Sequence, residues 1–287
     1  MTTNFLKNLP LKKFDRTPHL QGSRLQAGDE GYAQVPYSKL AGQFLVAEEK
    51  LDGGQTGVSF SAGGELLEQS RGHYLYGGGR ERQYNLFKRW TSAHEAALLD
   101  VLEDRYVAYG EWMHKKHAVF YDALPHYWNE FDIWDRSIEK FIDTETRKKI
   151  LTNAPVLQAP VLFAGIAPKK LSDLLTLIVN SYAKTPKWRA RFEEIVKREG
   201  FDVAKAWANA DKSDKMEGLY LKTEENGVVT GRYKFVRHDF VQAVKESKLH
   251  HSAQPFIPNQ LAEGVDIFSP VLTKTWQDCG VVTKTEL

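Results

Sequence analysis

Short apolar runs separated by glycine and polar residues predict antiparallel strands in the first part of the chain. Residues 44–47 form one such run, which ends directly before the Glu-Glu-Lys triplet at 48–50. Residues 57–61 alternate between apolar and small side chains, and the glycine pair at 63–64 then turns the chain back. We therefore expect a strand that carries Lys50 to its end, followed by antiparallel strands rather than a βαβ unit.

The middle of the chain changes to the spacing of helices. Ser92 and Glu95 have the form of a capping box, and the apolar residues that follow predict an amphipathic helix to about residue 102. Strands are predicted at 106–109 and 131–134, because both runs are rich in aromatic and β-branched residues. From about 136 to 210 the pattern is helical, which predicts a helical insertion between strands.

The Asn226-Gly227 pair predicts a two-residue turn between two further strands. A regular hairpin around this turn places Leu221 opposite Arg232. Period-two alternation then puts five residues on one face of the ribbon: Glu217, Leu219, Leu221, Arg232 and Lys234. Lys222 falls on the other face unless the strand bulges.

Composition indicates a globular protein without a membrane segment. Of the 287 residues, 42% are hydrophobic and 26% charged, and the net charge is only +2. No run approaches the roughly 18 apolar residues of a membrane span, and the first residues lack the apolar run of a signal peptide. The single cysteine, Cys279, excludes an internal disulfide and a cysteine-based zinc site. We therefore expect a cytoplasmic protein.

Lys50 lies in Lys-x-Asp-Gly, a short motif that also occurs by chance. A lysine amine attacks the α-phosphorus of a nucleoside triphosphate only when unprotonated, so its pKa, ordinarily about 10.4, must be lowered. A divalent metal and basic side chains would lower it, and the candidate residues are Arg71, Lys222, Arg232 and Lys234. Carboxylates suit Mg²⁺ or Mn²⁺, and the candidates are Glu217 and Asp52.

The motifs that follow Lys50 are specific as an ordered set, although each alone has an ordinary structural interpretation. They are Ser70-Arg71-Gly72, Tyr109-Gly110-Glu111, residues 131–135, residues 217–222 and Arg232-Tyr233-Lys234. This set resembles the lysine nucleotidyltransferases and, within them, a nick-sealing bacterial branch of the ATP-dependent RNA ligases. The resemblance implies an α+β, nucleotidyltransferase (ATP-grasp-like) fold of antiparallel sheets flanked by helices, with the nucleotide pocket between the sheets.

The resemblance also implies roles for the residues around the nucleotide. Lys50 becomes covalently linked to AMP, and Glu49 lies against the adenine. Arg71 engages ribose and phosphate, Glu111 binds a ribose hydroxyl, and Phe131 stacks on the base. ATP is accordingly the expected cofactor, with Mg²⁺ or Mn²⁺.

The remaining motif positions are implied to act on the phosphates and the metal. Asp52 belongs to the nucleotide site and Glu217 to the metal, while Lys222 and Lys234 are both catalytic and nucleotide-binding. Arg232 is also implied to be catalytic, although the best-known RNA ligases carry lysine there, and arginine cannot take part in proton transfer. Two positions match the family pattern less well, a second aromatic and the residue after the glycine pair: Tyr127 and Gln55.

The implied activity is the joining of RNA 3′-hydroxyl and 5′-phosphate ends, in nicked duplex RNA, through lysyl-AMP and RNA-adenylate intermediates. RNA repair with separate end-healing enzymes is the expected context. A DNA ligase or a capping guanylyltransferase shares the first step but usually carries an OB-fold. We expect an adenylation domain at 1–245 and a short extension at 246–287, too small for that barrel. An inactive relative that only binds nucleic-acid ends is the third alternative, which the intact Lys50 disfavours.

Overall fold

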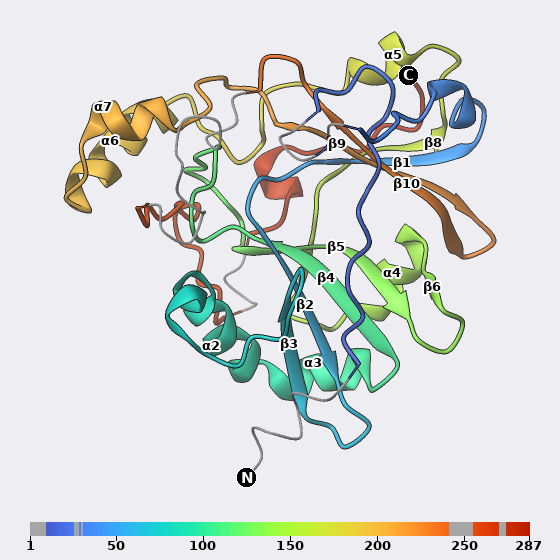
Figure 1. The fold of residues 1–287 in the computed structure, drawn as a ribbon, viewed down its shortest axis with the longest axis horizontal. Helices are drawn as coiled ribbons and strands as arrows, with labels where there is room; N and C mark the ends of the chain where they lie inside the picture. The colour runs from blue at the N-terminus through green and yellow to red at the C-terminus, as the bar shows by residue number, and fades with distance from the viewer. Residues whose placement is uncertain (1–9, 26–28, 30, 241–254, 270–273) are drawn as a thin grey trace.

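Two mainly antiparallel sheets form the framework of the protein in the computed structural model, which describes residues 10–25, 29, 31–240, 255–269 and 274–287 (Figure 1). The smaller sheet has the order β10-β9-β1-β8. Its strands are β1 (Phe44–Glu49), β8 (Val161–Ile166), β9 (Gly218–Glu225) and β10 (Val228–Val236). The larger sheet has the order β3-β2-β4-β5-β6, and β7 pairs in parallel with β5. Its strands are β2 (Gly54–Phe60), β3 (Leu66–Ser70), β4 (Tyr106–Trp112), β5 (Trp128–Asp135), β6 (Lys140–Phe141) and β7 (Leu157–Gln158).

Helices flank these sheets, so the predicted α+β class of antiparallel sheets flanked by helices is confirmed (Figure 1). The α-helices are α2 (Asn85–Ala93), α3 (Glu95–Leu102), α4 (Thr144–Ile150), α5 (Leu171–Leu175), α6 (Trp188–Arg198) and α7 (Val203–Ala208). The predicted helix near Ser92 is present, but its predicted cap is wrong. Ser92 lies inside α2, and α3 begins at Glu95 with no capping side chain. In the described part of the chain, no helix is long and apolar enough to cross a membrane.

The segment at 136–210 is helical only in part. It contains α4 to α7, but also β6, β7 and β8. The apolar run of β8 pairs with β1 and completes the smaller sheet, an environment that helical periodicity does not indicate. Beyond residue 246, the described residues pack on the rest of the protein. For example, the Lys284 N–H donates to the Leu162 carbonyl at 3.0 Å. The domain boundaries themselves remain a prediction.

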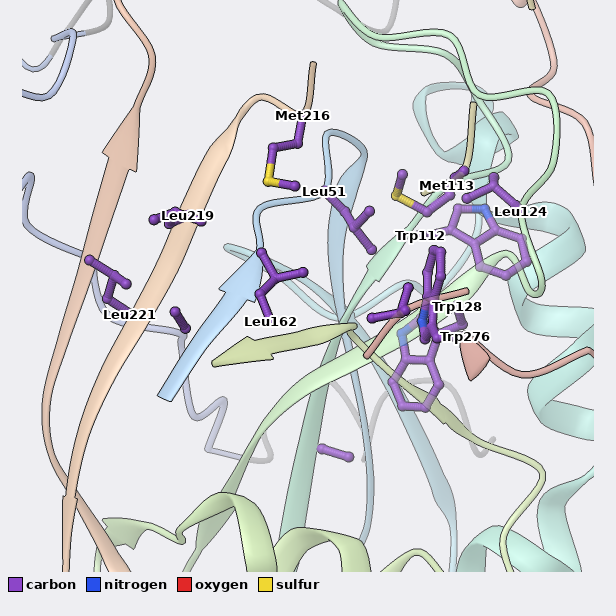
Figure 2. Close-up of a cluster of buried hydrophobic side chains, with 14 of the residues drawn as sticks. Leu51, Trp112, Met113, Leu124, Trp128, Leu162, Met216, Leu219, Leu221 and Trp276 are labelled. Carbon is purple, nitrogen blue, oxygen red and sulfur yellow. The ribbon is translucent and has the colours of Figure 1, made fainter. Parts of the chain in front are cut away.

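One large cluster of buried hydrophobic side chains draws residues from both sheets (Figure 2). Leu219 and Leu221 of β9 lie on one side of it, and Trp112 and Trp128 of β4 and β5 lie on the other. All four side chains are at most 1% exposed. Alternation along β9 therefore directs Leu219 and Leu221 into the core and leaves the intervening residues on the opposite face.

The β9–β10 hairpin corrects the predicted strand register. Asn226 and Gly227 adopt positive φ angles, 51° and 82°, as the predicted tight turn requires. The register then shifts at Thr230, whose hydroxyl contacts Thr223, and the bulge changes every later pair. Arg232 consequently lies opposite Lys222 rather than opposite Leu221.

The bulge therefore changes which side chains share a face of the ribbon. Arg232 and Lys234 face the same way as their partners Lys222 and Tyr220, and not the same way as Leu219 and Leu221. The predicted grouping of Arg232 and Lys234 with the two leucines is wrong. Lys222 joins the basic residues of β10 because of one extra residue in the strand.

Candidate active site

A pocket of about 1100 Å³ lies between the two sheets. The smaller sheet contributes Glu49 at the end of β1 and Lys234 of β10, and Lys50 follows β1 directly. The larger sheet contributes Glu111 of β4 and Phe131 of β5. Because residues far apart in the sequence meet here, the pocket brings together most of the motifs predicted for the nucleotide site.

Lys50 is held at the end of β1 by the start of the neighbouring strand β9. Its backbone N–H donates to the Gly218 carbonyl at 3.0 Å, and its Nζ lies 2.8 Å from Glu217 Oε2. The side chain of Glu217 is only 1% exposed, whereas that of Lys50 is 25% exposed and reaches the pocket. The predicted nucleophile and the predicted metal ligand are thus direct neighbours.

Two further carboxylates, Glu111 and Asp52, interact electrostatically with Lys50. Glu111 Oε1 accepts a hydrogen bond from the Gly53 N–H at 2.9 Å, so it stabilises the turn after Lys50. Asp52 Oδ2 accepts two backbone N–H groups, from residues 118 and 119, each at 2.7 Å. We call the charged residues that line this part of the pocket the pocket cluster: Lys50, Asp52, Glu111, Glu217 and Lys234.

The carboxylates of the pocket cluster change the expected electrostatics of Lys50. Burial alone would lower the pKa of Lys50, but Glu217, Glu111 and Asp52 together raise it above its ordinary value. Burial also raises the pKa of Glu217 to about 7 and that of Glu111 to about 8, despite the nearby lysine. The charged neighbours that shift the pKa of Lys50 are therefore acids, whereas the prediction gave this role to cations.

Lys234 is the lysine of the pocket cluster whose pKa is lowered. Its Nζ lies 3.4 Å from Asp29 Oδ2, and its side chain is 15% exposed. Burial and the positive charge of Lys50 lower the pKa of Lys234 to about 8, with smaller contributions from Arg16 and Arg71. Near neutral pH Lys234 is still mainly protonated and can bind an anion.

Other predicted nucleotide residues also line the pocket. Glu49 is 2% exposed and accepts a hydrogen bond from the Ser181 hydroxyl at 2.6 Å, and burial raises its pKa to about 7. Phe131 is half-buried, with its ring 5.3 Å from that of Phe14. Arg71 is exposed at the pocket wall. Of the two positions that match the family pattern less well, Gln55 lines the pocket and Tyr127 does not.

Lys222 and Arg232 belong to a second group of charges that reaches the pocket through Glu48, and neither of the two lines the pocket itself. Lys222 Nζ contacts Glu48 Oε1 at 2.7 Å and the Phe131 carbonyl at 2.9 Å. The Arg232 guanidinium lies 3.9 Å from the ring centre of Phe141 and 3.7 Å from Asp132. We call this group the buried cluster: Glu48, Glu130, Asp132, Arg147, Lys222 and Arg232. Lys222, predicted to bind the nucleotide and to be catalytic, is thus engaged inside this cluster, and the catalytic roles of Lys222 and Arg232 stay predictions.

The donor set for a divalent metal is small. Within the described ranges, no three acidic, histidine or cysteine side chains come together as a metal-binding group. Mg²⁺, however, usually keeps several waters and binds through one or two carboxylates together with substrate phosphates. Glu217 fits a shared site of this kind, because it is a buried carboxylate at the pocket wall.

Sequence patterns did not indicate three other parts of the pocket wall. They are the N-terminal residues Phe14, Asp15 and Thr17, the glycines at 77–79, and His117. Gly77 and Gly78 have φ angles of 105° and 140°, which a residue with a side chain rarely adopts. The glycine run was therefore a usable signal for an unusual loop, whereas the N-terminal residues carry no local signal.

Comparison with known proteins gives the following matches. Structures of Naegleria gruberi RNA ligase variants are similar to this chain, one with ATP and manganese (14% identity, TM-score 0.49) and one without ligand (15% identity, TM-score 0.49). Each match covers 79% of this chain but only 56% of the ligase chain. No curated protein sequence matches significantly.

A family model gives the decisive match. The model described as RNA ligase matches residues 43–236, which run from the start of β1 to the end of β10. The matched region therefore includes all strands of both sheets and every residue of the pocket cluster. Because the match covers more than half of the chain, this protein belongs to the RNA ligase family.

Proposed function

We propose that the protein is an ATP-dependent RNA ligase that joins 3′-hydroxyl and 5′-phosphate ends through a lysyl-AMP intermediate on Lys50. The observation that carries the proposal is the position of Lys50, which lies at the end of β1 in the pocket with Glu217 at 2.8 Å. Lys234 on the same pocket wall supplies a positive charge for phosphate. Membership of the RNA ligase family makes RNA the substrate to test first.

In the first step, the Lys50 amine attacks the α-phosphorus of ATP. A nitrogen–phosphorus bond forms, the bond from that phosphorus to the β-phosphate oxygen breaks, and pyrophosphate leaves. Lys50 must first lose a proton, and the acceptor at hydrogen-bond distance is Glu217, whose pKa of about 7 suits this role. A divalent metal on the phosphates would neutralise charge on the transferred phosphate, and Glu217 would join its ligands once the proton from Lys50 has passed to solvent.

The two later steps use the same pocket. An oxygen of the RNA 5′-phosphate attacks the phosphorus of lysyl-AMP, and the Lys50 amine leaves. The RNA 3′-hydroxyl then attacks the activated 5′-phosphate and expels AMP. Each step transfers a nucleotidyl or phosphoryl group, so each needs the same positive charge, which Lys234 and Arg71 provide.

We assign the other pocket residues to positioning of the nucleotide. Glu111 is placed to bind a ribose hydroxyl, Phe131 to stack on the base, and Glu49 to contact the adenine. Asp52 acts indirectly, because its carboxylate is already engaged by two backbone N–H groups of the loop at 118–119. We propose a similarly indirect role for the predicted catalytic residues Lys222 and Arg232, through the floor of the pocket.

Intact-protein mass spectrometry after incubation with ATP and Mg²⁺ or Mn²⁺ tests the first step. We expect the wild type to gain the mass of one AMP and Lys50→Ala to gain none. Failure of the wild type to gain AMP across pH values and metals would overturn the proposed activity. An unchanged adduct in Lys50→Ala would overturn only the assignment of the nucleophile.

Sealing of nicked duplexes tests the substrate. We expect faster joining when the 3′-hydroxyl side is RNA than when it is DNA, with a 5′-phosphate on the other side. Equal rates would count against specialisation for RNA, faster joining with DNA would favour a DNA ligase, and transfer of GMP would favour a capping enzyme. Adenylation without any joining would indicate a relative that binds ends without sealing them. A role in cytoplasmic RNA repair, with separate enzymes that prepare the ends, follows from the same proposal.

A further inference from the structure

An N-terminal segment pairs with β10 at Lys234. The Lys234 N–H donates to the Pro18 carbonyl at 3.0 Å, and the Leu20 N–H donates to the Lys234 carbonyl at 2.9 Å. Further back along this segment, the Lys12 carbonyl accepts the Tyr109 hydroxyl at 2.8 Å, from the larger sheet. The segment thus runs from one sheet to the other beside the pocket (Figure 1).

A chain of buried hydrogen bonds starts in this segment and leads to the Lys234 side chain. The Val236 N–H donates to Ser23 Oγ at 2.9 Å, and Ser23 Oγ lies 2.7 Å from His19 Nδ1. His19 Nε2 lies 2.6 Å from Asp29 Oδ2, which in turn lies 3.4 Å from Lys234 Nζ. His19 and Asp29 are 4% and 3% exposed, so the chain is shielded from solvent.

The hydrogen bonds determine which ring nitrogen of His19 carries the proton. A neutral ring that donates from Nε2 to the Asp29 carboxylate leaves Nδ1 as the acceptor of the Ser23 hydroxyl proton, and Ser23 Oγ in turn accepts the Val236 N–H. Burial and the nearby Lys234 lower the pKa of His19 to about 4, which agrees with a neutral ring. The Asp29 carboxylate accepts the hydrogen bond from Nε2 and is also contacted by Arg16.

We propose that His19 and Asp29 are positioning residues for Lys234. Asp29 holds the Lys234 ammonium at the pocket wall, and His19 holds the Asp29 carboxylate in the orientation that does so. Without Asp29, Lys234 would remain close to the positive charge of Lys50 and would lose the carboxylate that its Nζ contacts. The inference rests on the proposed function, because it assigns to the pair an effect on nucleotide binding through Lys234.

A double-mutant cycle tests whether Asp29 acts through Lys234. The measured quantity is the dissociation constant of α,β-methylene-ATP, which cannot release pyrophosphate, by calorimetry on the full-length protein. We expect Asp29→Asn to weaken binding roughly tenfold, the scale of a lost charge-assisted hydrogen bond. In the Lys234→Met background we expect the same substitution to change binding less than about twofold.

Asp135→Asn is the matched control for this cycle. Asp135 is also a buried aspartate paired with an arginine, since its Oδ2 lies 2.6 Å from Arg105 Nη2, but it does not line the pocket. We expect it to lower the melting temperature without changing nucleotide affinity in either background. Additive effects of Asp29→Asn and Lys234→Met, or an equal effect of Asp135→Asn, would overturn the inference.

Substitutions of His19 keep the test informative even if Asp29→Asn does not fold. His19→Leu removes the donor to Asp29 and should weaken binding about fivefold, whereas His19→Gln retains an N–H donor and should lie within about twofold of the wild type. Equal losses in both variants would contradict the role of that donor. A wild type that neither binds the analogue nor gains AMP would overturn the proposed function as well. A wild type that gains AMP but shows additive effects would overturn only this inference.

Discussion

The pocket cluster and the buried cluster are built from the same types of charged residue but differ in access to solvent. In the pocket cluster, the side chains of Lys50 and Lys234 are 25% and 15% exposed. In the buried cluster, Lys222, Glu48 and Arg147 are completely buried and contact one another through Glu48. A lysine in the pocket can exchange its partner for a ligand, whereas a lysine in the buried cluster cannot leave its partners without exposing an unpaired charge.

The two clusters also differ in their balance of acidic and basic groups. The buried cluster has three carboxylates and three basic groups, whereas the pocket cluster has three carboxylates and two lysines. Carboxylates beside Lys50 can bind a cation that enters the pocket, including a metal that accompanies a nucleotide. The comparison therefore predicts that substitutions in the pocket affect activity and that those in the buried cluster affect stability.

The largest expected effect comes from Lys50→Met. Loss of the nucleophile should reduce AMP attachment by at least about 10⁴-fold, while the melting temperature changes little because Lys50 is partly exposed. Intact mass measured over time, together with thermal unfolding, checks both parts. Lys148→Met on α4, which removes an exposed ion pair with Glu145, is the control and should retain wild-type adenylation. A large loss of stability in Lys50→Met would remove the contrast between the clusters.

Lys222→Met tests the other side of the comparison. Removal of one partner from a buried ion pair leaves Glu48 and Asp132 without their lysine, which should cost about 3–5 kcal/mol of unfolding free energy. Urea denaturation of this variant and of Lys50→Met gives the difference directly. Folded Lys222→Met protein should still attach AMP. Equal stability of the two variants would show that burial does not separate the clusters in this way.

Glu49 combines features of the two clusters, because it lines the pocket and is nevertheless buried. Its pKa of about 7 in the folded protein is above the ordinary 4.5, so the folded state holds a proton that the unfolded state releases. This contribution to stability is complete below pH 4.5 and is lost as the pH rises through 7. Relative to Glu49→Gln, the wild type should lose about 3 kcal/mol between pH 4 and pH 8. A difference that does not change with pH would contradict the assigned protonation.

The parts of the fold that depend on residues close together in the sequence were predictable. The β1 strand before Lys50 and the turn at Asn226-Gly227 are confirmed, because each is determined by a local pattern. The bulge at Thr230 was not predictable, since it depends on packing between two strands. That single extra residue in β10 places Arg232 opposite Lys222, so the predicted grouping of side chains on the hairpin was wrong for a tertiary reason.

The sequence predicted those residues of the candidate site that belong to motifs. Lys50, Glu111, Glu217 and Lys234 were all found from motifs and all line the pocket. Asp29 was not found, because its contact with Lys234 spans 205 residues and no local pattern indicates it. Motifs identify residues that belong to the family pattern, but only the three-dimensional arrangement separates contact with a ligand from support of the pocket.

Arg232→Lys gives the smallest expected effect. It tests whether a residue predicted to be catalytic contacts the ligand or only supports the pocket. The guanidinium packs 3.9 Å and 4.3 Å from the ring centres of Phe141 and Phe14, which suits a planar cation better than an ammonium. We expect a loss of about 1 kcal/mol in unfolding free energy and less than about a threefold change in the rate of AMP attachment. Time courses of AMP attachment and urea denaturation measure the two quantities. A drop in the adenylation rate of more than about tenfold, with stability unchanged, would show that Arg232 acts in the reaction as the pocket cluster does. Loss of packing alone cannot produce that combination.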